Sequence, residues 1–244
     1  MRHILLLVLV LAGCRTVGWD GKVERWGSMR EVMHDGRTEG RVLVFSAAHG
    51  PDTVGIGALA ELAGEVSIVD GATWITRSTA SGKLATSQGA AADAKAALLV
   101  TASVPEWVEL PVDRDIALDD VPEWAGFAGR EWSVAPFVVR GKLLDLETHV
   151  LHGACPYAGD VPTDREPVRR KAAFAFGTLV GFWARDGAGT ITHAGQNVHA
   201  HALVRGEESY TAHVDRVRIG AGSVLLVPRD RERVSPSHSV SRTY

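Results

Sequence analysis

The sequence predicts an α+β fold made mostly of antiparallel β-sheets with a few short helices. Most segments are short runs rich in Val, Ile, Leu and aromatic residues, which favour β-strands, and Gly, Pro or Asp residues separate them. The segments that favour helices are few and short. With 244 residues, 45% of them hydrophobic and 23% charged, the composition is that of a globular protein with one large domain or two small ones.

The first fourteen residues have the features of a bacterial lipoprotein signal peptide. Residues 4–12 form an apolar run that is too short to span a membrane, and the motif Leu-Ala-Gly-Cys at 11–14 resembles a lipobox. We therefore expect lipidation of Cys14 and a lipid-anchored location in the cell envelope, in the bacterial outer membrane or periplasm or at the cell surface. A plain secretory signal or an uncleaved anchor are the alternatives. Cys155 would then lack an intrachain partner, so a disulfide framework is excluded and a buried Cys155 side chain is expected.

The next segments alternate between helix and strand patterns. We expect residues 15–25, which are polar and mixed, to be a tether. The Ser-Met-Arg-Glu sequence at 28–31 has the pattern of a capping box and predicts a short helix that Gly36 would end. Residues 42–49 are ambiguous between strand and helix, and Val-Gly-Ile-Gly-Ala at 54–58 predicts a glycine-rich turn.

Strands dominate the rest of the chain. Residues 65–69 and 72–77 predict a tight hairpin, because Asp-Gly at 70–71 favours a two-residue turn. The alanine-rich segment 90–98 predicts a helix, and a second, short helix is expected near 121–124. Further strands are expected over 99–104, 107–112, 137–146 with a possible kink at Gly141, 174–183, 189–203, 210–219 and 223–227. The tail, 229–244, is charged and serine-rich and is expected to be disordered.

Three of the ten histidines predict a metal site near the end of the chain. His199 and His201 project from the same face if they lie on a strand, since alternate strand residues share a face. A hairpin that turns at Gly206 would bring His213 beside them from the next strand. Three imidazoles leave a coordination position free, which suits a catalytic metal better than a structural one.

Four stretches, taken in order, resemble bacterial α-acetolactate decarboxylases over residues 26–228. They are the opening helix at 28–36, the GxG…GE…DG pattern at 54–71, the GTLVGFW strand at 177–183 and the HxH…HVD hairpin at 198–215. The resemblance implies two similar halves, an N-terminal α/β half over 26–130 and a β-rich C-terminal half over 131–228 that carries the metal. It also implies a homodimer, a zinc ion held by His199, His201 and His213, and an active-site carboxylate at Glu65.

The resemblance implies a reaction as well, the loss of CO2 from 2-acetolactate to give acetoin. Zinc would act as a Lewis acid, Glu65 would donate a proton, and no organic cofactor is needed. Two departures leave the activity open. The family's substrate-facing arginine falls on His149, which we expect to contact substrate less strongly, and only Glu232 could stand in for a later glutamate.

Two other functions fit parts of the sequence. A cupin-like metal enzyme would explain the histidine pattern but does not require the 54–71 pattern. A non-catalytic envelope lipoprotein that binds a metal or a small hydroxy-keto acid would explain the two departures. A nucleic-acid partner is not expected, because the net charge is −3 and no basic stripe is present. Membrane contact is expected through the lipid anchor only.

Overall fold

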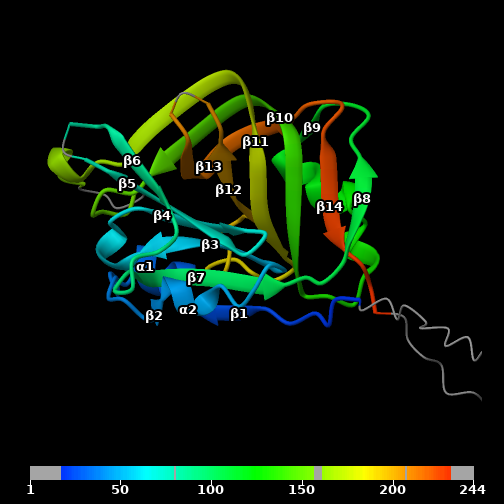
Figure 1. Ribbon diagram of the computed structural model, residues 1–244, viewed down its shortest axis with the longest axis horizontal. Helices are drawn as coiled ribbons and strands as arrows, with labels where there is room; N and C mark the ends of the chain where they lie inside the picture. Colours follow the sequence, from blue (N-terminus) through cyan, green and yellow to red (C-terminus); the bar gives the residue numbers. More distant parts are fainter. Residues whose placement is uncertain (1–17, 80, 157–160, 207, 232–244) are drawn as a thin grey trace, which may run out of the picture.

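The computed structural model describes residues 18–79, 81–156, 161–206 and 208–231. The expected signal peptide with Cys14, and most of the expected disordered tail with Glu232, lie outside these residues. The described chain forms two antiparallel sheets with few short helices, so the predicted fold class is confirmed (Figure 1).

The first sheet runs in the order β1-β7-β3-β4-β5-β6, and β2 pairs with the first residues of β7. Its strands are β1 (Glu24–Trp26), β2 (Val42–Leu43), β3 (Thr53–Leu59), β4 (Glu65–Val69), β5 (Ala72–Ser78), β6 (Leu84–Gln88) and β7 (Lys95–Ser103). The predicted hairpin joins β4 to β5, with Asp70 and Gly71 both at positive φ (51° and 72°), as a tight hairpin turn requires. Residues of this sheet line one side of the site described below.

The second sheet runs in the order β8-β14-β10-β11-β12-β13-β9, and β10 also pairs with β13, so four of its strands close into a ring. Its strands are β8 (Trp107–Pro111), β9 (Ile116–Ala117), β10 (Val134–Val150), β11 (Val168–Ala184), β12 (Val198–Val204), β13 (Tyr210–Ile219) and β14 (Val224–Pro228). The chain enters this sheet at β8, which is earlier than the boundary expected near residue 130. The predicted strand over 189–203 begins only at Val198.

The helices are short and lie between the strands. They are α1 (Met29–Met33), α2 (Val44–Ala47), α3 (Val121–Trp124) and the 3₁₀ turns Ala60–Leu62, Leu118–Asp120, Phe127–Gly129 and Thr163–Arg165. The predicted cap is present in part, because the Ser28 side chain accepts a hydrogen bond from the Glu31 backbone N–H, while the Glu31 carboxylate accepts one from the Ser28 hydroxyl rather than from the backbone N–H that a full capping box uses. The ambiguous segment 42–49 contains both a short strand and a short helix. No helix among the described residues is long and apolar enough to cross a membrane.

Two segments differ from the prediction because close packing against neighbouring strands determines their conformation. Residues 54–58 are not a turn but the middle of β3, and every residue of that strand is buried. A Cβ atom on Gly57 would lie 2.1 Å from the Leu98 carbonyl oxygen, so glycine is needed here for close backbone approach, not for turning. Residues 90–98 are not helical, and Lys95 begins the long buried strand β7. Sheet pairing outweighs the helix propensity of alanine in this segment.

This close approach leads to a stability prediction. The Gly57→Ala substitution is expected to lower the free energy of unfolding by about 3 kcal/mol, the upper part of the range for overpacking, because its nearest neighbour is backbone and cannot rotate away. Urea denaturation would measure the change. Gly129→Ala, where an added Cβ meets nothing within 4 Å, is the control and should change stability by less than about 1 kcal/mol. Equal stabilities for the two variants would contradict the close-packing argument.

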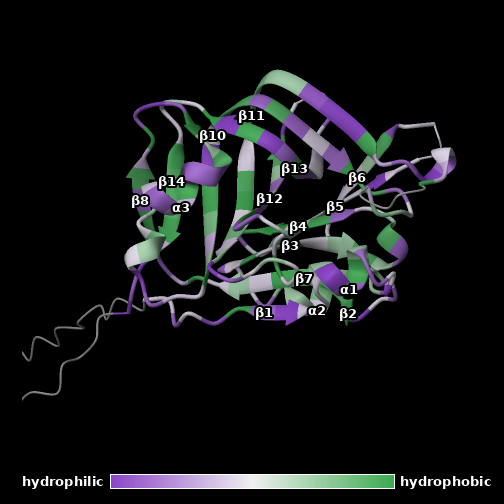
Figure 2. Ribbon diagram, turned by 180° about the vertical axis from the view of Figure 1, so that it is seen from behind, coloured by the Kyte–Doolittle hydropathy of each residue, from purple (hydrophilic) through white to green (hydrophobic). Residues whose placement is uncertain are grey.

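One hydrophobic core joins the two sheets. Ile56 and Val100 of the first sheet and Phe137 and Phe182 of the second belong to the same buried cluster. Hydrophilic residues gather on outer elements such as β1 and α1, whereas β14 is almost wholly hydrophobic (Figure 2). Trp19 is also part of this core, 2% exposed, and its backbone donates a hydrogen bond to the Arg229 carbonyl. The segment expected to be a tether is therefore attached to the fold from residue 18 onward.

Candidate metal centre

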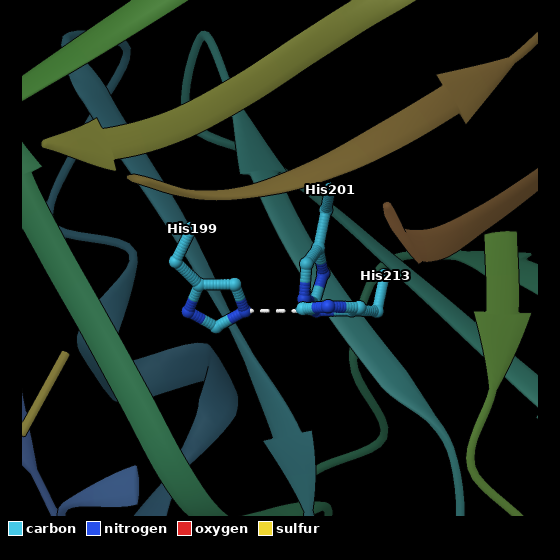
Figure 3. A group of neighbouring side chains, drawn as sticks. All are labelled: His199, His201 and His213. Carbon is cyan, nitrogen blue, oxygen red and sulfur yellow. Dashed lines mark hydrogen bonds between the residues drawn. The ribbon is translucent and has the colours of Figure 1, made fainter. Parts of the chain in front are cut away.

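Three imidazoles converge in the second sheet. His199 and His201 alternate on β12, and the predicted hairpin pairs His201 directly with His213 on β13. Their rings point toward one another (Figure 3), all three residues are at most 7% exposed, and one nitrogen from each lies within 4.8 Å of the others. The hairpin therefore gathers three potential ligands on rigid strands.

The spacing and the protonation of these rings suit a divalent metal. Zinc–nitrogen bonds of about 2.05 Å in a tetrahedron place ligand nitrogens about 3.4 Å apart. The 3.1 Å between His199 Nε2 and His213 Nδ1 is close to that value. Burial, with a smaller contribution from His193, lowers the pKa of His199 to about 3, and burial also places the pKa values of His201 and His213 well below the usual range. Neutral imidazoles with free lone pairs are the form that binds metals.

Contacts behind the rings fix their orientation. His199 Nδ1 donates to the Ile191 carbonyl at 2.8 Å, which leaves Nε2 as the potential ligand. Ser67 Oγ, from the first sheet, lies 3.4 Å from His201 Nδ1 and also bonds Thr211 Oγ1. The Thr211 backbone in turn donates to Thr76 Oγ1 at 2.8 Å. These polar contacts connect the histidine hairpin to the first sheet.

The Ser67 contact can be tested by removing its hydroxyl. We expect Ser67→Ala to weaken zinc binding by about 10-fold, the lower end of the range for such outer contacts, because the 3.4 Å distance is long for a hydrogen bond. Competition with a chromophoric zinc chelator would measure the affinity. Ser46→Ala, which removes an exposed hydroxyl bonded only to a local carbonyl, is the matched control and should leave zinc affinity unchanged. An affinity change of less than twofold for Ser67→Ala would contradict a role in orienting His201.

Glu65 faces the histidines from the opposite sheet. It begins β4, is 2% exposed, and places Oε2 at 3.6 Å from His201 Nε2. Burial raises the pKa of Glu65 to about 8, and the negative charge of Asp215 raises it further. The hydrogen bond that the Leu151 backbone N–H donates to Oε1, at 3.2 Å, acts in the opposite direction and lowers the pKa. At pH 7 both Glu65 and His201 are therefore neutral, and their contact is not a salt bridge. The carboxyl group holds a proton beside the three imidazoles.

His149 lies at the same site, as expected from its place in the sequence. It is on β10, 3% exposed, and pairs with His213 in the strand register, with the two ring centroids 4.7 Å apart. Its Nδ1 lies 2.7 Å from an oxygen of Asp215, whose other oxygen lies 3.2 Å from Arg169. Asp215 was not expected here; it lies two residues after His213, at a bulge in β13 where the register against β10 shifts.

His193 is a further histidine at the site, one that the sequence did not indicate. Its ring centroid is 5.3 Å from that of His213 and 6.1 Å from that of His199. Burial, and then the neighbouring His149, lowers its pKa to about 4. His193 precedes β12 and reaches the site from a turn, so its spacing from His199 carried no strand signal.

The space between these residues is small. The cavity is lined by five histidines, Glu65, and apolar groups that include Met29, Met33, Leu98 and Leu151. Its free volume is about 10 Å³, about that of one water molecule. Among the described residues that line it there is no Lys or Arg. This free volume suits metal ions held by the lining side chains and is smaller than an organic substrate.

Comparison with known proteins supports the fold and leaves the chemistry open. No family model matches the chain, and no curated protein sequence matches it. Among solved structures it is similar to α-acetolactate decarboxylase from Bacillus subtilis strain 168, with a TM-score of 0.62 and 17% identity over 85% of each chain. For acetolactate decarboxylase from B. subtilis subspecies spizizenii the TM-score is 0.63, with 16% identity over 85% of this chain and 86% of that one.

A third similar structure is a Staphylococcus aureus protein of unknown function described as similar to α-acetolactate decarboxylase. Its TM-score is 0.60, with 16% identity over 85% of this chain and 84% of that one. At these identities the similarity establishes the acetolactate decarboxylase-like fold. It favours that fold over the double-stranded barrel of a cupin-like enzyme.

Proposed function

We propose that this protein is a metal-dependent decarboxylase that converts 2-acetolactate, or a closely related 2-hydroxy-3-oxo acid, to acetoin and CO2. The observation that carries the proposal is the buried, proton-bearing carboxyl of Glu65, which lies opposite three neutral histidines whose nitrogens converge. The similarity of the fold to two acetolactate decarboxylases supports the choice of reaction. Zinc is the proposed metal, although three imidazoles would also accept other divalent ions.

The proposed ligands are His199, His201 and His213. A divalent ion bound there would supply Lewis-acid stabilisation for the negative charge that develops on the substrate oxygens. In the reaction, the bond between C2 and the carboxylate breaks and CO2 leaves. The electron pair of that bond moves toward the C3 keto oxygen, so that an enediol remains. The burial of the site keeps water away from this electron-rich carbon.

Glu65 would complete the reaction by proton transfer. The carbon that loses CO2 must gain a proton, and Glu65 is the proton-bearing carboxyl that faces the three histidines. The Leu151 N–H holds one carboxyl oxygen, so the other is directed toward the histidines. A carboxyl fixed on one side of the substrate would protonate a single face of the carbon and give one enantiomer of acetoin. His149, which pairs with His213 from β10, is the proposed neighbour of the departing carboxylate.

A metal-binding protein without catalysis is the second candidate. The small cavity favours it, since the site admits an ion without rearrangement but not a substrate. The absence of Lys and Arg from the described lining residues favours it too, because a carboxylate substrate would meet no permanent positive side chain.

Turnover separates the two candidates. The purified full-length chain is stripped with a chelator, reloaded with Zn²⁺, and given racemic 2-acetolactate, while acetoin and CO2 are measured. The decarboxylase proposal expects equal amounts of both products, loss of activity in the stripped protein and recovery with Zn²⁺. Stoichiometric zinc with no acetoin above the spontaneous background would instead establish the second candidate.

A further inference from the structure

A second group of metal ligands adjoins the first and is not used by it. His149, His213 and Asp215 each offer one ligand atom, and these atoms lie within 4.8 Å of one another. We propose that they form a second metal position, so that the centre holds two divalent ions with His213 between them. The inference extends the proposed function but rests only on its metal centre, not on the decarboxylation.

The strand register creates this second position. His149 on β10 pairs with His213 on β13, and Asp215, the extra residue where the register of β13 against β10 shifts, places a carboxylate oxygen 2.7 Å from His149 Nδ1. The His149 and His213 residues are 3% and 7% exposed, while the Asp215 side chain, at 22%, reaches the edge of the site. Two imidazoles and a carboxylate are a common ligand set for zinc and for other first-row divalent ions.

The charges favour a cation at this position. Asp215 contributes a negative charge beside a cavity whose described lining contains no Lys or Arg. Its second oxygen is paired with Arg169, a side chain that is 53% exposed, so the arginine can move into solvent when an ion takes its place. A second ion would also supply the permanent positive charge that a substrate carboxylate needs, and His149 would then act through that ion.

His213 connects the two positions through its two ring nitrogens. Its Nδ1 lies 3.1 Å from His199 Nε2 and belongs to the first position, which leaves Nε2 for the second. Binding through both nitrogens releases the remaining ring proton, as metal binding to protein ligands commonly does. The second position has a carboxylate that is partly open to solvent and shares its histidine, so it is expected to be the weaker one.

Counting bound metal tests the inference. The purified full-length chain is equilibrated with buffered Zn²⁺, and bound zinc is measured by mass spectrometry of the metal; Co²⁺ and its visible absorption provide a second readout. We expect two ions per chain, one tight and one weaker. His149→Asn and Asp215→Asn should each bind one ion, His199→Ala should lose the tight one, and His213→Ala should bind neither tightly.

The controls exclude folding defects and surface binding. His49 is exposed, pairs with Glu24 and is not in either ligand set, so His49→Ala should still bind two ions. Asp215→Asn preserves side-chain shape, and circular dichroism verifies that each variant is folded. One ion per chain in the wild type, or two ions in folded His149→Asn and Asp215→Asn, would overturn the inference. One ion per chain in the wild type would leave the decarboxylase proposal intact. Two ions without acetoin formation would refute the decarboxylase proposal but would support the second metal position.

Discussion

Replacing His201 with alanine is expected to abolish decarboxylation and to weaken tight zinc binding by more than 100-fold. The ring is 1% exposed and its Nε2 lies 3.6 Å from Glu65 Oε2, so the substitution removes one of the three proposed ligands together with the group that Glu65 faces. Removal of an outer contact to a ligand commonly costs about 10- to 100-fold in metal affinity, and removal of the ligand must cost more. Zinc content after dialysis and acetoin formation at saturating substrate are the measurements.

The matched control for this substitution is His49→Ala, which removes an exposed imidazole from the first half of the chain. It should retain wild-type zinc affinity and activity. A His201→Ala protein that is folded, binds tight zinc and still produces acetoin would remove the three-histidine centre from any account of this protein. A loss of secondary structure would be seen by circular dichroism, and His201→Gln would then replace it as the test, since glutamine retains more of the buried volume.

The second large effect is expected for Glu65→Gln. This change keeps the size of the side chain and its acceptor for the Leu151 N–H but removes the transferable proton. General acid catalysis contributes about 10²- to 10⁴-fold, so kcat should fall by that range while zinc content stays the same. At pH 7 Glu65 is protonated in the fold but ionised in the unfolded chain, so folding must take up a proton, and its replacement by a neutral amide should raise the free energy of unfolding at this pH.

Glu61→Gln is the control for this second substitution. Glu61 is exposed, contacts Thr38 and lies only four positions earlier in the chain, so its loss should leave kcat unchanged. The combination of intact zinc binding with a low kcat distinguishes a proton donor from a structural carboxyl, whose loss would lower stability or metal content instead. Wild-type kcat in zinc-loaded Glu65→Gln would assign the proton to another group.

The sequence was informative wherever a local rule decides the structure. The Asp-Gly turn at 70–71, the Ser28 helix cap and the histidine hairpin all depend on residues a few positions apart, and the structure has each of them. The sequence was misleading where contacts with segments far along the chain determine the local conformation. Glycines at 55 and 57 indicate a turn until β7 is seen packed against them, and alanines at 90–98 favour a helix until sheet pairing extends them.

The same distinction applies to the candidate site. His199, His201 and His213 could be grouped from strand alternation and one hairpin, whereas Glu65 required the resemblance to a family, because nothing local connects it with residues far along the chain. His193 and Asp215 were not assigned to the site from the sequence. His193 reaches the site from a turn, where no strand periodicity indicates its direction. Asp215 can be assigned to the site only once His149, on another strand, is seen beside it.

The division of the site between two sheets has a consequence for how the molecule matures. Ser67 and His201, which touch across the site, are separated by 134 positions in the chain. During synthesis Glu65 emerges long before His199, His201 and His213. The hairpin of β12 and β13 would then be able to bind an ion before the two sheets pack against each other. Under the proposed function, such a chain would hold the ion without its proton donor, and Glu65 would join the ion only when the two sheets pack together.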